Sequence, residues 1–350
     1  MPPDDHGLAA ELQTRRIKTL CNDVPVQFAT TRKRPTWRTP IKRRRWVATK
    51  IEEIQQRTEI ACASAAKQLK NVQAIYSNTT ATLLGHQLSQ RLSLPHIWHL
   101  REFPENYGMH LADGVSAFRE RLDSASQLIA ISKTVAQRLA GPQEDRCHII
   151  YNGVGELAEF ESYWKRRSER PENPVFRFLL LGQILPSKGH DQAIRAMERI
   201  LELGLKAELH IVGSGDQGWL DGLVASSSAA KSIRVFPPTD APFQTIIDAD
   251  TLLMCSPMEA MGRVTVEAMV AGCPVIGLDA FGTTELIDHG STGFLYRTDS
   301  ELAAAMAKMM TNEEQRNTIA KSAFQTASTK FNNRNYANRV ADVLRLVLSS

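Results

Sequence analysis

The chain has 350 residues, of which 43% are hydrophobic and 23% charged, and its net charge is +4. This composition is typical of globular proteins and excludes a disordered chain, and the length suits two α/β domains better than one. No apolar run approaches the roughly 18 residues that a membrane span needs, and no N-terminal signal region is recognisable. We therefore expect a cytoplasmic protein.

The cysteines are few and scattered, at Cys21, Cys62, Cys147, Cys255 and Cys273. None of them has the CxxC spacing of a structural zinc site, and their number is odd. This usage indicates a reducing compartment rather than a disulfide framework.

The segment from Arg32 to Lys50 is the most basic part of the chain and contains no acidic residue. Because Pro35, Pro40 and two tryptophans interrupt it, we interpret it as a loop or a short amphipathic element. A solvated loop is one hypothesis. Contact with an anionic membrane surface is another, since each basic residue near such a surface contributes about 1 kcal/mol and tryptophan suits the headgroup zone. Binding to nucleic acid is the least favoured, because no nucleic-acid module is recognisable.

From residue 51 onward, helices and strands alternate. A helix is predicted at 51–70, and strands are predicted at 74–77, 95–100, 128–132 and 147–151. This alternation indicates a parallel, doubly wound sheet, in which functional groups lie at the carboxyl ends of the strands. The polar residues at those ends are His99, Arg101, Glu102, Ser132 and Asn152.

A polar segment after residue 155 indicates a linker, and a second set of strands follows it. These strands are predicted at 176–181, 208–212, 233–236, 251–255 and 274–278. The spacings Thr298-x-x-Glu301 and Thr311-x-x-Glu314 fit capping boxes that open two helices. A last helix is predicted at 334–348. The sequence therefore predicts an amino-terminal domain over 1–155, completed by 330–350, and a carboxy-terminal domain over 156–329.

The stretch that follows the strand at 251–255 holds the most distinctive chemistry. Glu259 lies on the predicted loop, and a helix begins near Gly262, which places Glu267 in about its second turn. The start of a helix binds anions through its free N–H groups, and a glycine there lets a ligand approach the backbone. Two carboxylates beside an anion site suit a ligand that also has hydroxyl groups. A nucleotide sugar has both a diphosphate and hydroxyls.

The string Ser256-Pro257-x-Glu259-x-x-Gly262-x-x-x-x-Glu267-Ala268-Met269, followed by Gly272-x-Pro274, resembles the retaining glycosyltransferases of family 4. The resemblance implies a GT-B fold, an α/β architecture with two Rossmann-like doubly wound domains facing a cleft. It implies transfer of a hexose from a nucleotide-diphosphate sugar to a polysaccharide, a lipid-linked saccharide or another glycoconjugate, with retention of configuration. It implies no cofactor, and no DxD-like metal motif follows a predicted strand.

The resemblance also implies roles for the donor-binding residues. Lys188 matches the second of two basic residues that grip the donor diphosphate on the loop that begins at Gly182, whereas Gln183 stands where the family usually has the first. Arg263 is our candidate for the missing charge. The helix start at Gly262 to Val264 would also hold the diphosphate.

Further roles concern the sugar and the ribose. Glu267 would hold the ribose hydroxyls and Glu259 those of the donor sugar. His99 matches a histidine that faces the donor sugar, so His99, Lys188 and Glu259 are the predicted catalytic residues. The turn from Gly282 to Glu285 resembles the Gly-Gly-x-x-Glu turn of the family.

One departure concerns the start of the chain. A helix is predicted at 8–16 and a short strand at 17–20, and the opening strand and Gly-rich loop of the family are expected to be missing. We therefore expect a labile amino-terminal domain and poor transfer. The alternatives are a catalytically inactive sugar-nucleotide-binding protein and, less favoured, a sugar-nucleotide epimerase on the same fold.

Overall fold

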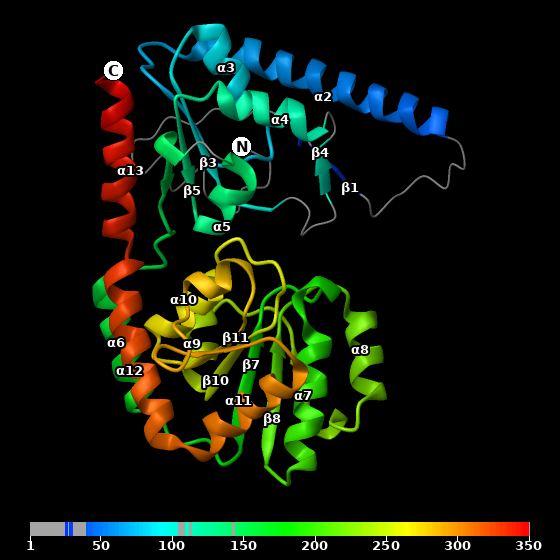
Figure 1. Cartoon of the computed structure of the whole chain (residues 1–350), viewed down its shortest axis with the longest axis vertical. Helices are drawn as coiled ribbons and strands as arrows, with labels where there is room; N and C mark the ends of the chain where they lie inside the picture. Colours follow the sequence, from blue (N-terminus) through cyan, green and yellow to red (C-terminus); the bar gives the residue numbers. More distant parts are fainter. Residues whose placement is uncertain are drawn as a thin grey trace. The chain divides into compact units, whose positions relative to one another are not determined.

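The computed structural model describes residues 25–26, 28–30, 40–103, 109–111, 114–141 and 144–349. The helix predicted at 8–16 and the strand predicted at 17–20 lie outside the described residues. The chain divides into two compact units (Figure 1). The first comprises Met1–Ile131, Val135–Ile149 and Ala341–Ser350, and the second comprises Ser132–Thr134 and Ile150–Val340.

A four-stranded parallel sheet forms the centre of the first unit. Its strand order is β2 (Ile75–Ser77), β3 (His96–Leu100), β5 (Gln127–Ala130) and β6 (Cys147–Ile149). All residues of β3 are buried, as expected of a central strand. The helices α3 (Leu84–Leu92) and α4 (Gly114–Asp123) belong to this unit, and β1 (Phe28–Thr30) pairs with β4 (Met109–Leu111) in an antiparallel ribbon. The parallel sheet agrees with the sequence prediction.

The helix α2 corrects the interpretation of the basic segment. It runs over Pro40–Gln68, so the basic residues from position 40 onward are helical and do not form a loop (Figure 1, blue helix). Proline suits the first helical position because it lacks only an N–H group that would be unpaired there, and no glycine or proline follows within α2. Cys62 and Ala65 of α2 pack in one hydrophobic cluster with Leu88 of α3. Residues 32–39 lie outside the described part of the chain.

The second unit contains a six-stranded parallel sheet. The strand order is β12 (Phe294–Tyr296), β11 (Val275–Leu278), β10 (Thr251–Met254), β7 (Phe176–Leu181), β8 (Ala207–Val212) and β9 (Ile233–Phe236). Five of these strands lie where the sequence predicts them, and β12 adds a strand that was not predicted. Because β7 and β10 are neighbours, the loops that follow them begin side by side.

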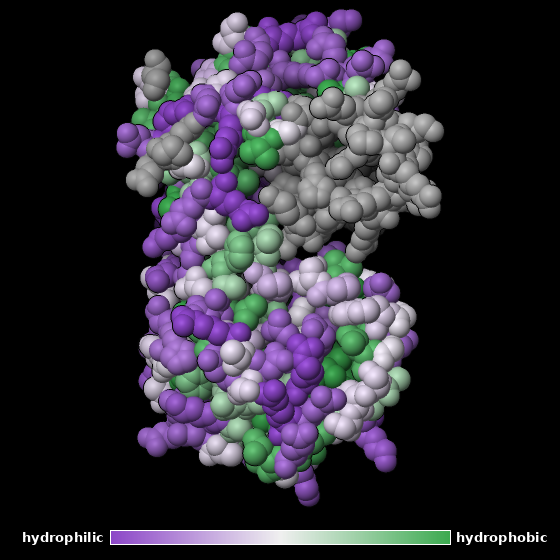
Figure 2. Space-filling model, turned by 45° about the vertical axis from the view of Figure 1, so that its right-hand side comes forward, coloured by the Kyte–Doolittle hydropathy of each residue, from purple (hydrophilic) through white to green (hydrophobic). Residues whose placement is uncertain are grey.

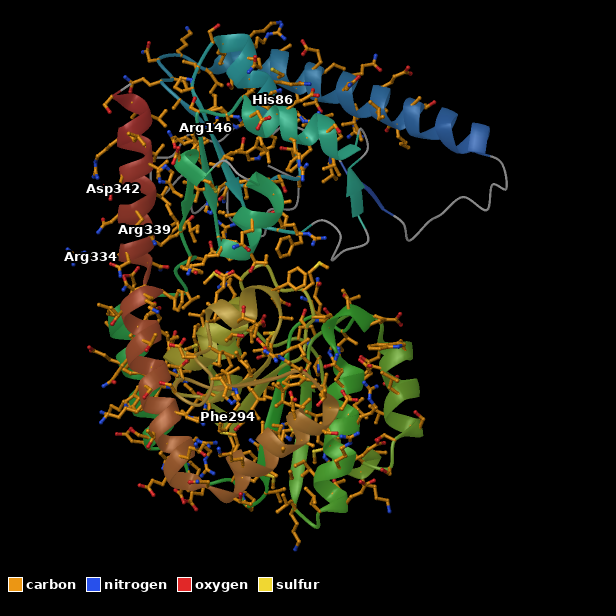
Figure 3. All side chains as sticks on the ribbon, in the orientation of Figure 1. His86, Arg146, Phe294, Arg334, Arg339 and Asp342 are labelled. Carbon is orange, nitrogen blue, oxygen red and sulfur yellow. The ribbon has the colours of Figure 1, made fainter. Side chains whose placement is uncertain are left out.

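Helices pack around this sheet in two groups. The helices α7 (His190–Glu202), α8 (Gln217–Ser226) and α11 (Asp299–Thr311) share one large hydrophobic cluster with the sheet. The others, α6 (Leu157–Ser168), α9 (Pro242–Asp248), α10 (Arg263–Val270) and α12 (Glu313–Lys330), contact one another. Lys308 of α11 lies over the ring of Phe294, which is labelled in Figure 3, with 4.9 Å from Nζ to the ring centroid.

The two predicted capping boxes have different outcomes. Thr298 caps α11 as predicted, because its Oγ1 accepts a hydrogen bond from the N–H of Glu301 at 3.2 Å. The prediction for Thr311 is wrong: this residue ends α11, and Asn312 caps α12 by accepting from the N–H of Gln315 at 3.0 Å. Both Thr and Asn cap well, so sequence alone did not separate them.

The last helix, α13 (Asn333–Leu348), agrees with the prediction, and the boundary between the units falls within it. Its Val343 and Val347 are buried, whereas Arg334, Arg339 and Asp342 are exposed (Figure 3). On the face of the molecule in Figure 2, hydrophilic side chains surround smaller hydrophobic patches. Within the described residues, no helix combines the length and the apolar character needed to cross a membrane.

Candidate functional site

The predicted donor-binding residues lie on loops at the carboxyl edge of the second sheet. Gly182 follows β7 directly, and Lys188 ends a short 3-10 turn, Pro186–Lys188, before α7 begins. Glu259 lies on the loop between β10 and α10, as predicted. The pairing of β7 with β10 explains how residues about 70 positions apart come together.

The two loops approach each other at Gly189. Its φ is +72°, and a Cβ atom there would lie 2.2 Å from the backbone oxygen of Cys255. Only glycine accommodates both the left-handed conformation and this contact. The N–H of Lys188 donates to the backbone oxygen of Leu185 at 2.9 Å, which closes the turn. The backbone that carries Lys188 is therefore held against the end of β10.

Lys188 and Glu259 form an ion pair across these loops. The distance from Nζ to Oε1 is 2.6 Å, and the side chains are 23% and 17% exposed, respectively. A part-buried pair with this geometry is a charge-assisted hydrogen bond. The structure thus brings together two residues for which the sequence predicts separate contacts with a ligand.

The start of α10 carries the second pair. Gly262 precedes the helix with a φ of +87° and has no side chain that could cap the first N–H groups. Arg263, the first residue of α10, contacts Glu267 at 2.9 Å from Nη2 to Oε1, with side-chain exposures of 60% and 11%. Val264 is half-buried beside them. Helix spacing of i to i+4 accounts for this pair.

The loop after β7 lacks the first of the two basic residues that the family pattern has, because Gln183 stands at that position. The N–H of Gly182 donates to the backbone oxygen of Val212 at 3.0 Å, and a Cβ atom on Gly213 would lie 1.7 Å from the oxygen of Gly182. The loops after β7 and β8 therefore touch through glycines. Gln183 is exposed and carries no charge, so Lys188 and Arg263 are the predicted donor-site residues that bring positive charge to this edge.

Glu285 lies in the second unit, where the sequence shows the Gly-x-x-Glu turn. Its carboxylate accepts hydrogen bonds from the N–H groups of Lys133 and Thr134, each at 2.7 Å, and from the hydroxyl of Tyr151 at 2.8 Å. Burial, together with this hydrogen bond and the Glu285 charge, raises the pKa of Tyr151. These contacts organise the segment Ser132–Thr134, which clusters with the second unit.

His99 belongs to the first unit, within β3, and is buried. Its Nδ1 lies 2.6 Å from the hydroxyl of Tyr76, and burial, with a smaller contribution from Arg101, lowers the pKa of His99 to about 3. The imidazole is therefore neutral near pH 7. Tyr76 is not among the predicted site residues, because its proximity to His99 depends on the pairing of β2 with β3, which no local sequence pattern encodes.

Glu102 also lies in the first unit and accepts hydrogen bonds from the N–H and the hydroxyl of Thr80 at 2.9 and 3.0 Å. It also accepts a hydrogen bond from the hydroxyl of Thr79. The loop after β2 is thus tied to the loop after β3, in keeping with the predicted position of Glu102 at a strand end.

Chemically, the edge of the second sheet offers two cations, two carboxylates and the start of a helix. Cations and N–H groups bind phosphate oxygens, and carboxylates accept hydrogen bonds from hydroxyls. Across the part of the chain that the structure describes, no group of three or more His, Cys, Asp or Glu side chains is placed to hold a metal ion.

The chain is similar to known glycosyltransferases. Residues 163–326 match the family model of glycosyl transferases group 1. The chain is 27% identical over 236 residues to an uncharacterized glycosyltransferase of Methanocaldococcus jannaschii, a match covering 63% of this chain and 60% of that protein. It is 30% identical over 190 residues to the D-inositol 3-phosphate glycosyltransferase of Pseudarthrobacter chlorophenolicus, over 50% of this chain and 44% of that protein.

Solved structures share the fold. Anabaena Alr3699/HepE in complex with UDP and glucose has a TM-score of 0.71 and 24% identity, covering 81% of each chain. Matches cover 60% of the Methanocaldococcus protein and 63% of a putative glycosyltransferase of Bacillus subtilis, so the chain spans less than two thirds of these relatives. Residues 163–326 therefore form a glycosyl transferases group 1 domain, carried by a chain with the GT-B fold.

Proposed function

We propose that this protein is a retaining glycosyltransferase of family 4 that transfers a hexose from a nucleotide-diphosphate sugar to an acceptor. The observation that carries the proposal is the pairing of Lys188 with Glu259 and of Arg263 with Glu267 beside the start of α10. Structural neighbours bound to UDP and to UDP-glucose support a nucleotide-sugar donor. The acceptor would be a polysaccharide, a lipid-linked saccharide or another glycoconjugate.

In this proposal, the cations act on the leaving diphosphate. Lys188, Arg263 and the N–H groups at the start of α10 would stabilise its charge, together with the backbone at Gly182 and Gly262. Such preorganised electrostatic stabilisation is usually the largest catalytic contribution, and the positive end of a helix dipole adds to it. Arg263 would replace the basic residue that is absent at Gln183.

The hydroxyls of the donor would bind the two carboxylates. Glu267 would accept from the ribose, and Glu259 from the transferred sugar. His99, which is neutral near pH 7, would contact the donor sugar through a hydrogen bond rather than through a charge. The assignment of these contacts rests on the resemblance to family 4.

Donor binding tests the proposal directly. Isothermal titration calorimetry against a panel of uridine-, guanosine- and adenosine-diphosphate sugars should identify a donor. Lys188→Ala and Glu267→Ala should then each weaken its binding by about ten- to a hundredfold, because hydrogen bonds to charged groups contribute about 1.5–3 kcal/mol. Lys206→Ala, which removes an exposed lysine immediately before β8, is the matched control and should not change donor binding. Unchanged binding in both site variants would refute this donor site.

We also propose that the basic segment from Arg32 to Lys50 holds the protein at an anionic, cytoplasmic membrane surface. The positive charge of this segment, which contains no acidic residue, and its two tryptophans motivate this proposal. Co-sedimentation with vesicles rich in phosphatidylserine should exceed that with phosphatidylcholine vesicles and fall with added salt, because screening acts over about 8 Å at physiological ionic strength. Equal binding to both vesicle types, or to neither, would contradict the proposal.

A further inference from the structure

Both cations of the candidate donor site are already paired with carboxylates. Lys188 contacts Glu259 at 2.6 Å, and Arg263 contacts Glu267 at 2.9 Å. These four side chains are the ones proposed to bind a diphosphate and the hydroxyls that accompany it. A diphosphate that enters the site therefore meets cations whose charge is already compensated.

The backbone keeps the first pair together. Gly189 seats the Lys188 loop against Cys255, where a Cβ atom would collide, and the N–H of Lys188 closes its own turn on Leu185. Glu259 follows Cys255 by four residues on the facing loop. The backbone that carries Lys188 is thus held beside the loop that carries Glu259, and the ammonium group leaves the carboxylate only by rotation of the lysine side chain.

The carboxylate opposes the binding of a bare diphosphate in two ways. It neutralises the ammonium group that would attract the phosphates, and it repels their negative charge at short range. The side chains are only 23% and 17% exposed, so water screens these effects incompletely. A ligand that also carries sugar hydroxyls offsets this penalty, because its hydroxyls donate hydrogen bonds to Glu259.

We propose that Glu259 discriminates against diphosphates that carry no sugar, so that the site prefers the sugar-bearing donor and releases the nucleoside diphosphate product. This inference rests on the proposed function and adds to it a specificity role for the Lys188–Glu259 pair. The Arg263–Glu267 pair lies within one helix, with 2.9 Å between Nη2 and Oε1, and Arg263 is 60% exposed, so its contribution to this discrimination is smaller.

Inorganic pyrophosphate, titrated calorimetrically at constant ionic strength into the full chain, tests the inference because it carries neither sugar nor base. Glu259→Gln keeps the shape of the side chain and removes its charge. It should bind pyrophosphate about three- to tenfold more tightly than the wild type. Glu267→Gln should gain about twofold or less. Asp240→Asn changes the net charge equally at an exposed loop residue and should bind as the wild type does.

The double variant Lys188→Ala/Glu259→Gln separates the pair from a general charge effect. The gain from Glu259→Gln should be smaller when Lys188 is absent, because only the repulsion between the Glu259 carboxylate and the phosphates is then removed. An undiminished gain relative to Lys188→Ala would overturn the inference. Unchanged or weaker pyrophosphate binding by Glu259→Gln, or no pyrophosphate binding by either protein, would also overturn it.

The donor screen is a separate measurement. If the wild type binds a nucleotide sugar but Glu259→Gln gains nothing toward pyrophosphate, the inference fails and the proposed function stands. If the wild type binds no nucleotide sugar, the proposed function fails whatever the pyrophosphate result. Loss of affinity for the nucleotide sugar in Glu259→Gln, together with the gain toward pyrophosphate, is the outcome expected when both hold.

Discussion

The two edges of the second sheet use charged residues differently. At the amino edge, Asp250 is 9% exposed and accepts hydrogen bonds from Arg170, from the side chain of Asn173 at 3.0 Å and from the N–H of Arg177 at 2.8 Å. At the carboxyl edge, the hydrogen bond between Lys188 and Glu259 joins two side chains. The first network ties loops to the backbone of the sheet, whereas the second pair joins two loops.

This difference separates a structural network from a binding site. A buried charge held by several groups, including backbone, is costly to remove because its partners remain buried without compensation. A pair made by side chains on loops exchanges partners more easily, because a ligand can supply the replacement contacts. Arg167 belongs to the network at the amino edge as well, since its guanidinium donates to the backbone oxygens of Ile247 and Ala249 at the end of α9.

The largest expected loss of stability is at the amino edge of the second sheet. Asp250→Ala should lower the free energy of unfolding of the second unit by about 3–5 kcal/mol, because it leaves the part-buried guanidinium of Arg170 without its carboxylate partner. Hydrogen exchange of the β7 and β10 amides measures this loss. Glu259→Gln is the comparison at the other edge and should cost about 1 kcal/mol or less. Equal losses for both variants would remove the distinction between the edges.

A smaller loss of stability is expected at Gly189, where the backbone supports the loops at the carboxyl edge of the second sheet. Gly189→Ala should destabilise the second unit by about 2–4 kcal/mol, because it combines a left-handed conformation with a collision against Cys255. Gly204→Ala is a matched control: its φ is +76°, but no atom lies within 4 Å of the added carbon. We expect it to cost about 1 kcal/mol. Urea unfolding followed by hydrogen exchange would compare them, and a similar cost for both would show that the loops are not tightly seated.

Local sequence patterns determined much of the fold. The apolar runs predicted nine of the strands in the two parallel sheets, and the turn from Glu259 to Gly262 predicted the start of α10, because strands, glycine turns and helix starts depend on neighbouring residues. The same locality explains why Arg263 and Glu267, four positions apart on one helix, could be expected to lie side by side. The predictions failed where two local signals competed, as at Thr311 and Asn312, and where a helix begins at Pro40, within the basic segment.

Only the tertiary structure decided which distant groups meet. Lys188 and Glu259 are joined because β7 and β10 pair in register, and His99 meets Tyr76 because β2 lies beside β3. Strand order results from packing of the whole chain rather than from any one segment, so no local pattern encodes it. The sequence identified the charged residues of the candidate site, but their mutual pairing, and the competition with a diphosphate that we infer from it, depend on this long-range geometry.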